Sequence, residues 1–299
     1  MSRGSESVYI IAGPTASGKS ALAMEMAATK DGVIVNADSL QIYDALPLLT
    51  AQPSSADKVA VPHALYGVLD PGTACSAGNW QEMAVPAIES ILDRGQTPIV
   101  TGGSGLYLKA LMEGLSPIPD IPDDIRAQAV VAYETMGENA FYSALQKRDP
   151  VMAARLHPGH KARLIRAWEV LEATGRYLAQ WQEIPPTPPP AHWRFMVTLV
   201  MPPRAGLYDR CNRRFDQMMA SGALEEVRRF DKHLSADNGP HGAPVTKALG
   251  FRLLQAALHG DIPLDEAVTQ AKAQTRHFAK RQVTWFRHQI TADRIVESP

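Results

Sequence analysis

Short apolar runs alternate with helix-forming segments over the first third of the chain. Each run is continuously apolar, which is typical of a strand buried on both faces of a parallel sheet. Strands that alternate with helices in this way predict a doubly wound α/β layer. The predicted strands lie at 8–12, 33–35 and 97–100, and the predicted helices at 19–29 and 80–93.

The pattern changes after residue 115. Two proline-rich segments, 116–122 and 184–190, bound a stretch with a helical pattern and no convincing strand. An apolar run at 195–200 then indicates a strand that returns to the sheet, and the chain from Leu207 onward is mostly helical in pattern. The predicted domain bounds are 1–116 and 193–299 for an α/β core with C-terminal helices, and 117–192 for a smaller all-helical insertion.

Composition and charge narrow the class of protein. The 299 residues are 45% hydrophobic with a net charge of -1, which is typical of a globular protein with a sizeable core. The two cysteines, Cys75 and Cys211, lie far apart, so neither a disulfide framework nor a structural zinc site is expected. No apolar run approaches the roughly 20 residues that span a bilayer. We therefore expect a cytoplasmic protein that does not associate with membranes.

The segment GPTASGKS at 13–20 matches the phosphate-loop pattern and lies between a predicted strand and a predicted helix. Backbone N–H groups of such a loop face an anion, the lysine meets terminal phosphate oxygens, and the hydroxyl after it joins the shell of Mg²⁺. ATP-binding kinases, other nucleotide-binding NTPases and further transferases share this loop, so it does not name the reaction. The expected binding residues are Gly13, Pro14, Thr15, Ala16, Ser17, Gly18, Lys19 and Ser20, with Ser20 at the metal.

Two polar segments follow predicted strands, at the edge where open α/β sheets bind ligands. Asp38 follows the second strand and has two functional interpretations, a magnesium ligand through water or a general base. A surface aspartate that caps the next helix is the structural alternative. Ser104 follows the strand at 97–100 within a glycine-rich stretch and is placed to donate a hydrogen bond to a ligand, although a simple strand-to-helix turn has similar weight.

Arginines and a basic aromatic segment complete the candidates. Arg210 and Arg214 share a helix face at i and i+4, and Arg163 and Arg166 flank an apolar pair; both spacings suit phosphate groups and also solvated helix faces. The segment KRQVTWFR at 280–287 combines cations with aromatic rings, as in RNA recognition, but its rings are equally consistent with core packing. The residues from 201 to 299 contain 15 Lys and Arg against 11 Asp and Glu, so this third of the chain is mildly basic.

Taken together, the segments GPTASGKS, DSLQIY, TGGSGLYLKAL, HPGHKARLIRAWEV and KRQVTWFR, in this order and at these separations, resemble bacterial tRNA dimethylallyltransferases, the isopentenyl transferase family. The resemblance spans nearly the whole chain, and only the phosphate loop is generic. It implies that the loop binds the pyrophosphate of dimethylallyl diphosphate with Mg²⁺, and that the nucleophile is the N6 amine of the adenosine 3′ to the tRNA anticodon, extruded from the loop.

The resemblance also implies residue roles. Asp38 would be the general base, Lys19 and Ser20 with Mg²⁺ would stabilise the departing pyrophosphate, and Ser104 would contact the adenosine. Arg210 and Arg214 match family arginines near the diphosphate. The partners would be the tRNA anticodon stem-loop and dimethylallyl diphosphate, with the enzyme acting as a monomer. The implied tRNA contacts are Asp38, Ser39, Leu40, Gln41, Ser104, Arg126, Ala162, Arg163, Leu164, Ile165, Arg166, Lys280 and Arg281.

The chain departs from the family pattern in a few places. Ser104 stands where the family usually has Thr, Gln52 where it has Lys, and Ala162 where Gln is common. Three other functions remain open at this point. They are a small-molecule or nucleoside kinase that uses the same loop for ATP, a relative that prenylates free adenine nucleotides, and a non-catalytic RNA-binding module.

Overall fold

The structure, a computed structural model, describes residues 5–236, 239 and 242–297. The chain divides into two compact units. One comprises Met1–Met112 with Pro189–Pro299, and the other is Glu113–Pro188. The second unit thus begins and ends slightly earlier than the segment 117–192 expected from the proline-rich bounds.

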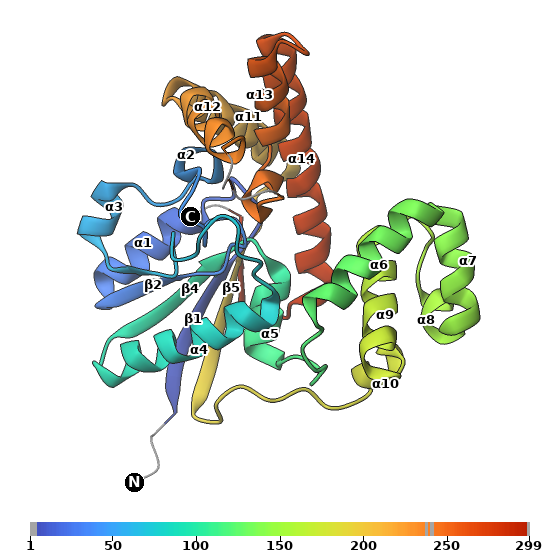
Figure 1. The fold of residues 1–299 in the computed structure, drawn as a ribbon. Coiled ribbons are helices and arrows are strands. Elements are labelled where there is room, and N and C mark those ends of the chain that lie inside the picture. The colour runs from blue at the N-terminus through green and yellow to red at the C-terminus, as the bar shows by residue number, and fades with distance from the viewer. Residues whose placement is uncertain (1–4, 237–238, 240–241, 298–299) are drawn as a thin grey trace. The chain divides into compact units, whose positions relative to one another are not determined.

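The first unit is built on a six-stranded sheet in the order β3-β2-β4-β1-β5-β6, and all of its neighbouring strands are parallel (Figure 1). The predicted α/β class is therefore confirmed. The two outer strands, β3 and β6, are short and were not foreseen. The strands are β1 Glu6–Ala12, β2 Gly32–Asn36, β3 His63–Ala64, β4 Thr97–Gly102, β5 Trp193–Val200 and β6 Arg294–Val296.

Helices cover both faces of this sheet, because the strands are apolar on both sides. Val8 and Ile10 of β1 pack in one core cluster with α4 (Ala77–Asp93) and α5 (Gly105–Glu113). Ile11, the neighbour of Ile10, points the other way and packs against α1 (Lys19–Thr29). This alternation follows from the two-residue period of a strand, and Figure 1 shows α1 on the opposite face from α4.

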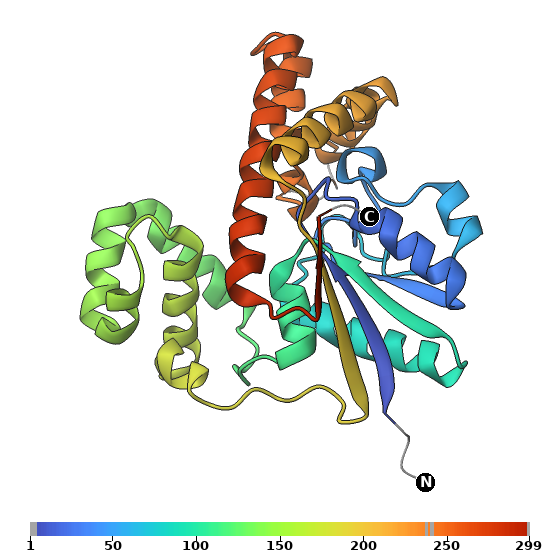
Figure 2. The ribbon, with the colours of Figure 1, turned by 180° about the vertical axis from the view of Figure 1, so that it is seen from behind.

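Further helices of the first unit lie beyond the carboxyl ends of the strands (Figure 2). Among them, α11 and α14 pack against each other, and Phe286 of α14 is fully buried in the main core. The aromatic residue before it, Trp285, is partly buried. Of the two interpretations of these rings, core packing and RNA stacking, core packing therefore accounts for Phe286. The remaining helices of this unit are α2 Pro47–Thr50, α3 Ser55–Ala60, which leads into β3, α11 Arg204–Ala220, α12 Ala223–Leu234, the 3₁₀ helix Pro244–Lys247, α13 Phe251–His259 and α14 Leu264–Gln289.

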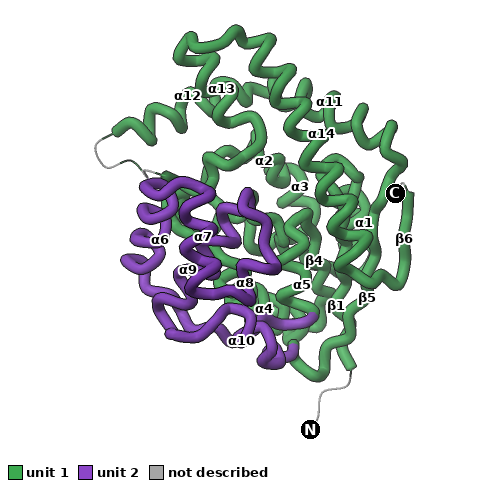
Figure 3. The backbone as a smooth tube through the Cα atoms, turned by 90° about the vertical axis from the view of Figure 1, so that its right-hand side faces the viewer, with its two compact units in different colours: residues 1–112, 189–299 green, residues 113–188 purple. Residues whose placement is uncertain are grey.

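The second unit consists of helices around a core of its own (Figure 3). Phe141 is fully buried, with its ring 5.1 Å from that of Tyr133 and 4.7 Å from that of Trp168. Separate apolar cores are what distinguish two domains from one. The helices are α6 Asp123–Met136, α7 Glu138–Arg148, α8 Pro150–Arg155, α9 Lys161–Thr174 and α10 Leu178–Gln182.

Over the residues that the structure describes, no helix combines the length and the apolar character that crossing a membrane requires.

Candidate active site

The phosphate loop lies between the end of β1 and the start of α1. A Cβ atom on Gly13 would lie 2.4 Å from the carbonyl oxygen of Val200, so only glycine allows β1 to leave the sheet beside the end of β5. Ala16 has a φ of 61°, a left-handed conformation that is uncommon outside glycine. A left-handed residue in a tight loop curls successive N–H groups toward one point, and the N-terminus of α1 adds its own unpaired N–H groups. The loop therefore has the form of an anion cradle.

Two arginines from α11 reach this loop, as their i, i+4 spacing allows. Nη1 of Arg210 donates to the carbonyl oxygen of Ser17 over 3.0 Å, and Nη1 of Arg214 donates to the hydroxyl of Thr15 over 3.1 Å. The Nε atom of Arg214 is buried without a hydrogen-bond partner in the described structure. A buried donor of this kind is costly unless a ligand or water meets it. The cavity beside the loop, about 340 Å³, is lined by Ala16, Ser17, Gly18, Lys19, Ser20, Arg210, Arg213, Arg214 and Gln217.

The loop that carries Asp38 is held by side chains at the ends of two strands. The Asn36 side chain accepts from the Asp38 N–H over 2.8 Å and donates to the Asp38 carbonyl oxygen over 3.0 Å. Ser104 accepts from the N–H of Ser39 over 2.8 Å, and its own N–H donates to the Ala37 carbonyl oxygen. One carboxylate oxygen of Asp38 accepts from the N–H of Leu40 over 3.0 Å. The position of the Asp38 carboxylate is thus determined by backbone contacts rather than by a flexible side chain alone.

Asp38 and the phosphate-loop cations belong to one electrostatic site. Burial lowers the pKa of Lys19 to about 8, and the Asp38 carboxylate opposes that shift while Arg214 adds to it. Burial also lowers the pKa of Arg214, again against the influence of Asp38. The pKa of Tyr66 is raised well above its usual range by burial and then by Asp38. Two desolvated cations that face one another favour an anionic ligand between them.

The structure therefore brings together most of the residues predicted for the reaction centre. The phosphate loop, Asp38, Ser104, Arg210 and Arg214 all lie at the carboxyl edge of the sheet in the first unit. Gln41 is turned to the carbonyl oxygens of Thr50 and Ala51, to which its amide donates.

The predicted tRNA contacts on α14 are exposed. Lys280 and Arg281 line a cavity of about 460 Å³ together with His277, Thr284 and Trp285. Cations beside an indole ring are the groups that meet phosphates and stack on bases in single-stranded RNA.

The other predicted tRNA contacts belong to the helical unit, and they differ in exposure. Ala162 and Arg163 are exposed, whereas the side chains of Leu164 and Ile165 are buried in the core of that unit. The latter two hold α9 in place, so any contact they make with a ligand would come from their backbone or from their effect on the neighbouring arginines.

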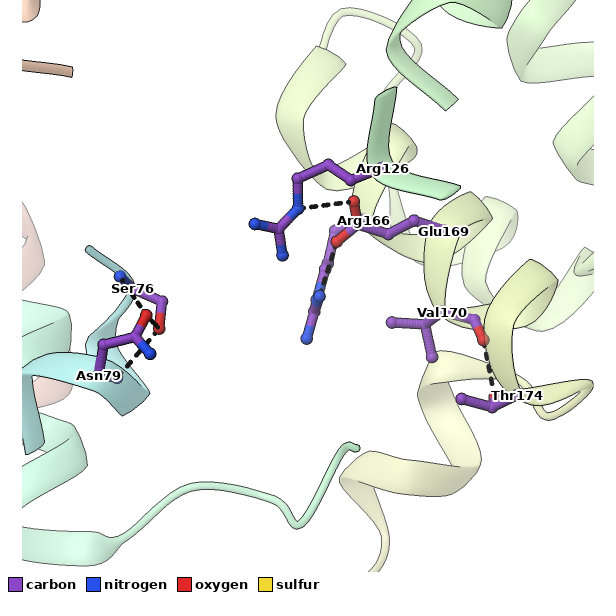
Figure 4. Close-up of polar contacts among 7 residues, drawn as sticks. All are labelled: Ser76, Asn79, Arg126, Arg166, Glu169, Val170 and Thr174. Carbon is purple, nitrogen blue, oxygen red and sulfur yellow. Dashed lines mark hydrogen bonds and ion pairs between the residues drawn. The ribbon is translucent and has the colours of Figure 1, made fainter. Parts of the chain in front are cut away.

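Arg126 of α6 and Arg166 of α9 are oriented by one buried carboxylate (Figure 4). Nη1 of Arg166 donates to Glu169 over 2.6 Å and Nε of Arg126 donates to it over 3.4 Å. The Glu169 side chain is 5% exposed, against 45% for Arg126 and 37% for Arg166. Because one carboxylate offsets two guanidinium groups, the cluster keeps a net positive charge toward solvent.

Several residues of the first-unit site were not predicted from the sequence. Asn36 and Tyr66 carry no motif of their own, although Asn36 directly follows a strand at the ligand edge, a position that marks polar residues as candidates. Arg213 and Gln217 follow from the helical period once Arg210 and Arg214 are assigned. Gln282 belongs to KRQVTWFR, but only the cations of that segment were selected.

The protein by itself supplies only some of the oxygen ligands that a magnesium ion needs. Over the described residues, no group of three or more His, Cys, Asp or Glu side chains is placed to hold a metal. The Ser20 hydroxyl at the exposed start of α1 is one oxygen donor. Mg²⁺ keeps several waters and is commonly bound by one or two protein groups plus substrate phosphates, so this set fits a metal that arrives with a diphosphate.

The parallel sheet, the phosphate loop and the facing carboxylate define an α/β protein of the phosphate-loop class, with an arginine-lined anion site. The model of the IPP transferase family matches residues 41–289, which is most of the chain. The chain therefore belongs to the IPP transferase family. This match begins after the phosphate loop and Asp38, but relatives that match 96% and 98% of the chain extend over both.

Two such relatives are named tRNA dimethylallyltransferase. That of Rhodospirillum centenum is 49% identical over 96% of this chain and 90% of its own length. That of Paramagnetospirillum magneticum is 50% identical over 98% of this chain and 91% of its own length.

Solved structures agree with this assignment. The full-length tRNA isopentenylpyrophosphate transferase of Bacillus halodurans has a TM-score of 0.67 and 31% identity, covering 98% of this chain and 90% of that chain. A eukaryotic dimethylallyltransferase, whose structures are described as acting on tRNA, has a TM-score of 0.79 and 26% identity, covering 94% and 70%.

The lowered pKa of Lys19 predicts pH-dependent anion binding. A bound pyrophosphate stabilises the ammonium form and raises the pKa, so binding above pH 8 requires proton uptake. We expect the affinity for pyrophosphate with Mg²⁺ to be highest below pH 8 and to fall by up to about tenfold per pH unit above it. Titration calorimetry from pH 7 to 9.5 measures this. The control is Lys19→Arg, whose side chain stays charged over this pH range. Its affinity for pyrophosphate is therefore expected to change with pH only through the titration of the ligand. If the original protein and Lys19→Arg show parallel dependences of affinity on pH, the role of Lys19 is refuted.

Proposed function

We propose that this protein transfers the dimethylallyl group of dimethylallyl diphosphate to the N6 amine of an adenosine in tRNA, 3′ to the anticodon, and releases pyrophosphate. Its relatives and its family support dimethylallyl transfer to tRNA. The observation that carries the assignment of residues is that a carboxylate, Asp38, shares one electrostatic site with the anion-binding cations Lys19 and Arg214. A carboxylate is a poor phosphate ligand, so its position indicates a different task.

That task is to accept a proton. The amine nitrogen attacks the allylic carbon, the carbon–oxygen bond to the diphosphate breaks, and the electron pair leaves with pyrophosphate. The new N–C bond places a positive charge on nitrogen, and Asp38 removes the proton that this nitrogen carries. General base catalysis of this type contributes roughly 10²–10⁴-fold. The remainder must come from orientation and from stabilisation of the leaving group.

The phosphate loop and the α11 arginines would stabilise the leaving pyrophosphate. The cradle formed by the loop, Lys19 and Arg214 meets negative charge that grows as the carbon–oxygen bond breaks. A magnesium ion held by Ser20 and by diphosphate oxygens would supply further charge neutralisation at the same oxygens. Ser104 would contact the adenosine. Its hydroxyl also accepts a hydrogen bond from the N–H of Ser39, which lies beside the proposed base.

The tRNA would be bound through exposed cations. Lys280 and Arg281 on α14, and Arg126, Arg163 and Arg166 in the helical unit, are the proposed contacts to its anticodon stem-loop. Phosphate contacts position an RNA, and an extruded base is then read in a pocket. We further propose that the protein acts as a monomer in the cytoplasm.

The kinase, the free-nucleotide prenyltransferase and the RNA-binding module are less favoured. Relatives across nearly the whole chain are named for transfer to tRNA, and the geometry around Asp38 and Lys19 suits catalysis rather than binding alone.

The decisive experiment incubates the purified protein with Mg²⁺, dimethylallyl diphosphate and unmodified tRNA, with and without ATP. Digestion of the RNA and nucleoside mass spectrometry then measure the product. We expect dimethylallyladenosine in both reactions, in equal yield. ATP-dependent product formation, or pyrophosphate release without tRNA at the same rate, would contradict the assignment.

The variant Asp38→Asn tests the base. The amide keeps the shape of the side chain but does not accept the proton, so we expect kcat to fall by about 10²–10⁴-fold. Fluorescence anisotropy with a labelled anticodon stem-loop is expected to show affinity within a few-fold of the unmodified protein. A kcat within a factor of two of the original would remove Asp38 from this role.

The arginines of the helical unit generate a salt-dependence prediction. Replacing Arg126 or Arg166 by Ala is expected to weaken binding of the stem-loop and to reduce the slope of log K against log salt by about 0.7–0.9 for each phosphate that the variant no longer neutralises. Arg94→Ala is the matched control. It lies before β4, at the amino edge of the sheet, where it contacts Ser90 and Gln96. Equal slopes for all three variants would show that neither arginine meets a phosphate.

A further inference from the structure

One glutamine joins the two loops that form the candidate reaction centre. Gln282 of α14 is 7% exposed, and both ends of its amide are used. Oε1 accepts from the backbone N–H of Thr15 in the phosphate loop over 2.8 Å. Nε2 donates to the backbone carbonyl oxygen of Gly103 over 2.8 Å. A single planar group therefore holds together two loops that lie 267 and 179 positions before it in the chain.

Each of the two residues that Gln282 contacts lies next to, or is hydrogen-bonded to, a proposed functional group. Thr15 receives a hydrogen bond from Arg214 through its hydroxyl, so the Gln282 contact is part of the anion cradle. Gly103 precedes Ser104, whose hydroxyl accepts from the N–H of Ser39, the residue after Asp38. The amide thus lies between the group that would hold the leaving diphosphate and the groups that would hold the base and the adenosine.

The surroundings of the amide leave little room for a different arrangement. A Cβ atom on Gly103 would lie 2.5 Å from Nε2 of Gln282, so a side chain at this position would displace the amide from its present place. The partners are one backbone donor and one backbone acceptor, and a glutamine side chain offers one of each in a fixed geometry. Leucine has neither group, and an ionised glutamate would place negative charge against the Gly103 carbonyl oxygen.

We propose that Gln282 is a positioning residue that sets the spacing between the diphosphate loop and the loop of Ser104 and Asp38. The proposal rests on the proposed function and adds a role that the exposed cations of the same segment do not have. Because Lys280 and Arg281 lie on the same turn of α14, the helix that would contact RNA is also fastened to both loops. Gln282 does not touch substrate in this scheme. It acts through the alignment of groups that do.

This role predicts a particular split in the kinetic parameters. Each loop keeps its own internal hydrogen bonds without Gln282, so each substrate still binds, but the nitrogen, the allylic carbon and the base are less well aligned. A misplacement of about 1 Å can cost on the order of 10²-fold in rate. We therefore expect Gln282→Leu to lower kcat by about 10- to 100-fold, with both KM values within about threefold.

The experiment compares Gln282→Leu, Gln282→Glu and the control Gln289→Leu. Gln289 is an exposed residue near the end of the same helix whose side chain contacts Lys109. Steady-state rates with dimethylallyl diphosphate and tRNA are measured together with thermal unfolding and with calorimetric binding of pyrophosphate and Mg²⁺. The proposal expects lowered kcat in both Gln282 variants, unchanged kcat in the control, and pyrophosphate affinity within about threefold throughout.

The glutamate variant provides a readout that a purely structural role would not move. A protonated carboxyl group has one donor and one acceptor, as the amide does, so it can again bridge Thr15 and Gly103. The ratio of kcat for Gln282→Glu to kcat for the original protein is expected to rise as pH falls from 8 to 5.5. This ratio cancels the titration of groups that both proteins share, and it applies even where the leucine variant unfolds.

The outcomes separate the two proposals. If the original protein makes no dimethylallyladenosine, the proposed function fails. If the original is active and the Gln282 variants keep their kcat, or if the ratio for Gln282→Glu is flat with pH, the function stands and the positioning role is wrong. A loss of pyrophosphate affinity as large as the loss of kcat would also overturn it, because Gln282 would then serve the anion cradle alone.

Discussion

The candidate reaction centre is organised around two partly buried, desolvated cations beside an anion cradle at the carboxyl edge of a parallel sheet. Lys19 and Arg214 are both desolvated, and their mutual repulsion is offset within the protein by Asp38. A site with this balance is stabilised by an incoming anion, which removes the repulsion and meets the unpartnered Nε of Arg214. The binding free energy of the proposed diphosphate would therefore depend on the protonation of Lys19, the group that would also stabilise it as a leaving group.

The fold supplies the rigid frame that such a site needs. Strands β1, β4 and β2 end side by side in the sheet, so the phosphate loop, the Ser104 loop and the Asp38 loop start from neighbouring positions. The loops are then joined to one another through backbone contacts, of which the Ser104–Ser39 hydrogen bond is one. Functional groups placed on short loops between rigid elements keep their geometry better than groups on long ones.

The helical unit has a different construction, which suits a different task. Its arginines are not buried, and Arg126 and Arg166 are oriented by the buried carboxylate of Glu169 while they remain open to solvent. Such a group can meet phosphates whose positions vary slightly along an RNA, at a small cost in ordering. Under the proposed function, the desolvated anion site would recognise the small diphosphate, and the exposed cations of the helical unit would contribute to binding of the large polyanion.

Local sequence determined much of this protein. The apolar runs, the glycine-rich turns and the helical periods specified the inner strands, the phosphate loop and the helical segment, because each depends on neighbours within a few residues. The short strands β3 and β6 escaped detection because so few residues carry the two-residue period. Only the tertiary structure decided that Arg214 reaches Thr15, that Asn36 holds Asp38, and that Gln282 bridges Thr15 and Gly103. A glutamine on a helix can face solvent or, like Gln282, face two loops, and no local sequence pattern distinguishes these two arrangements.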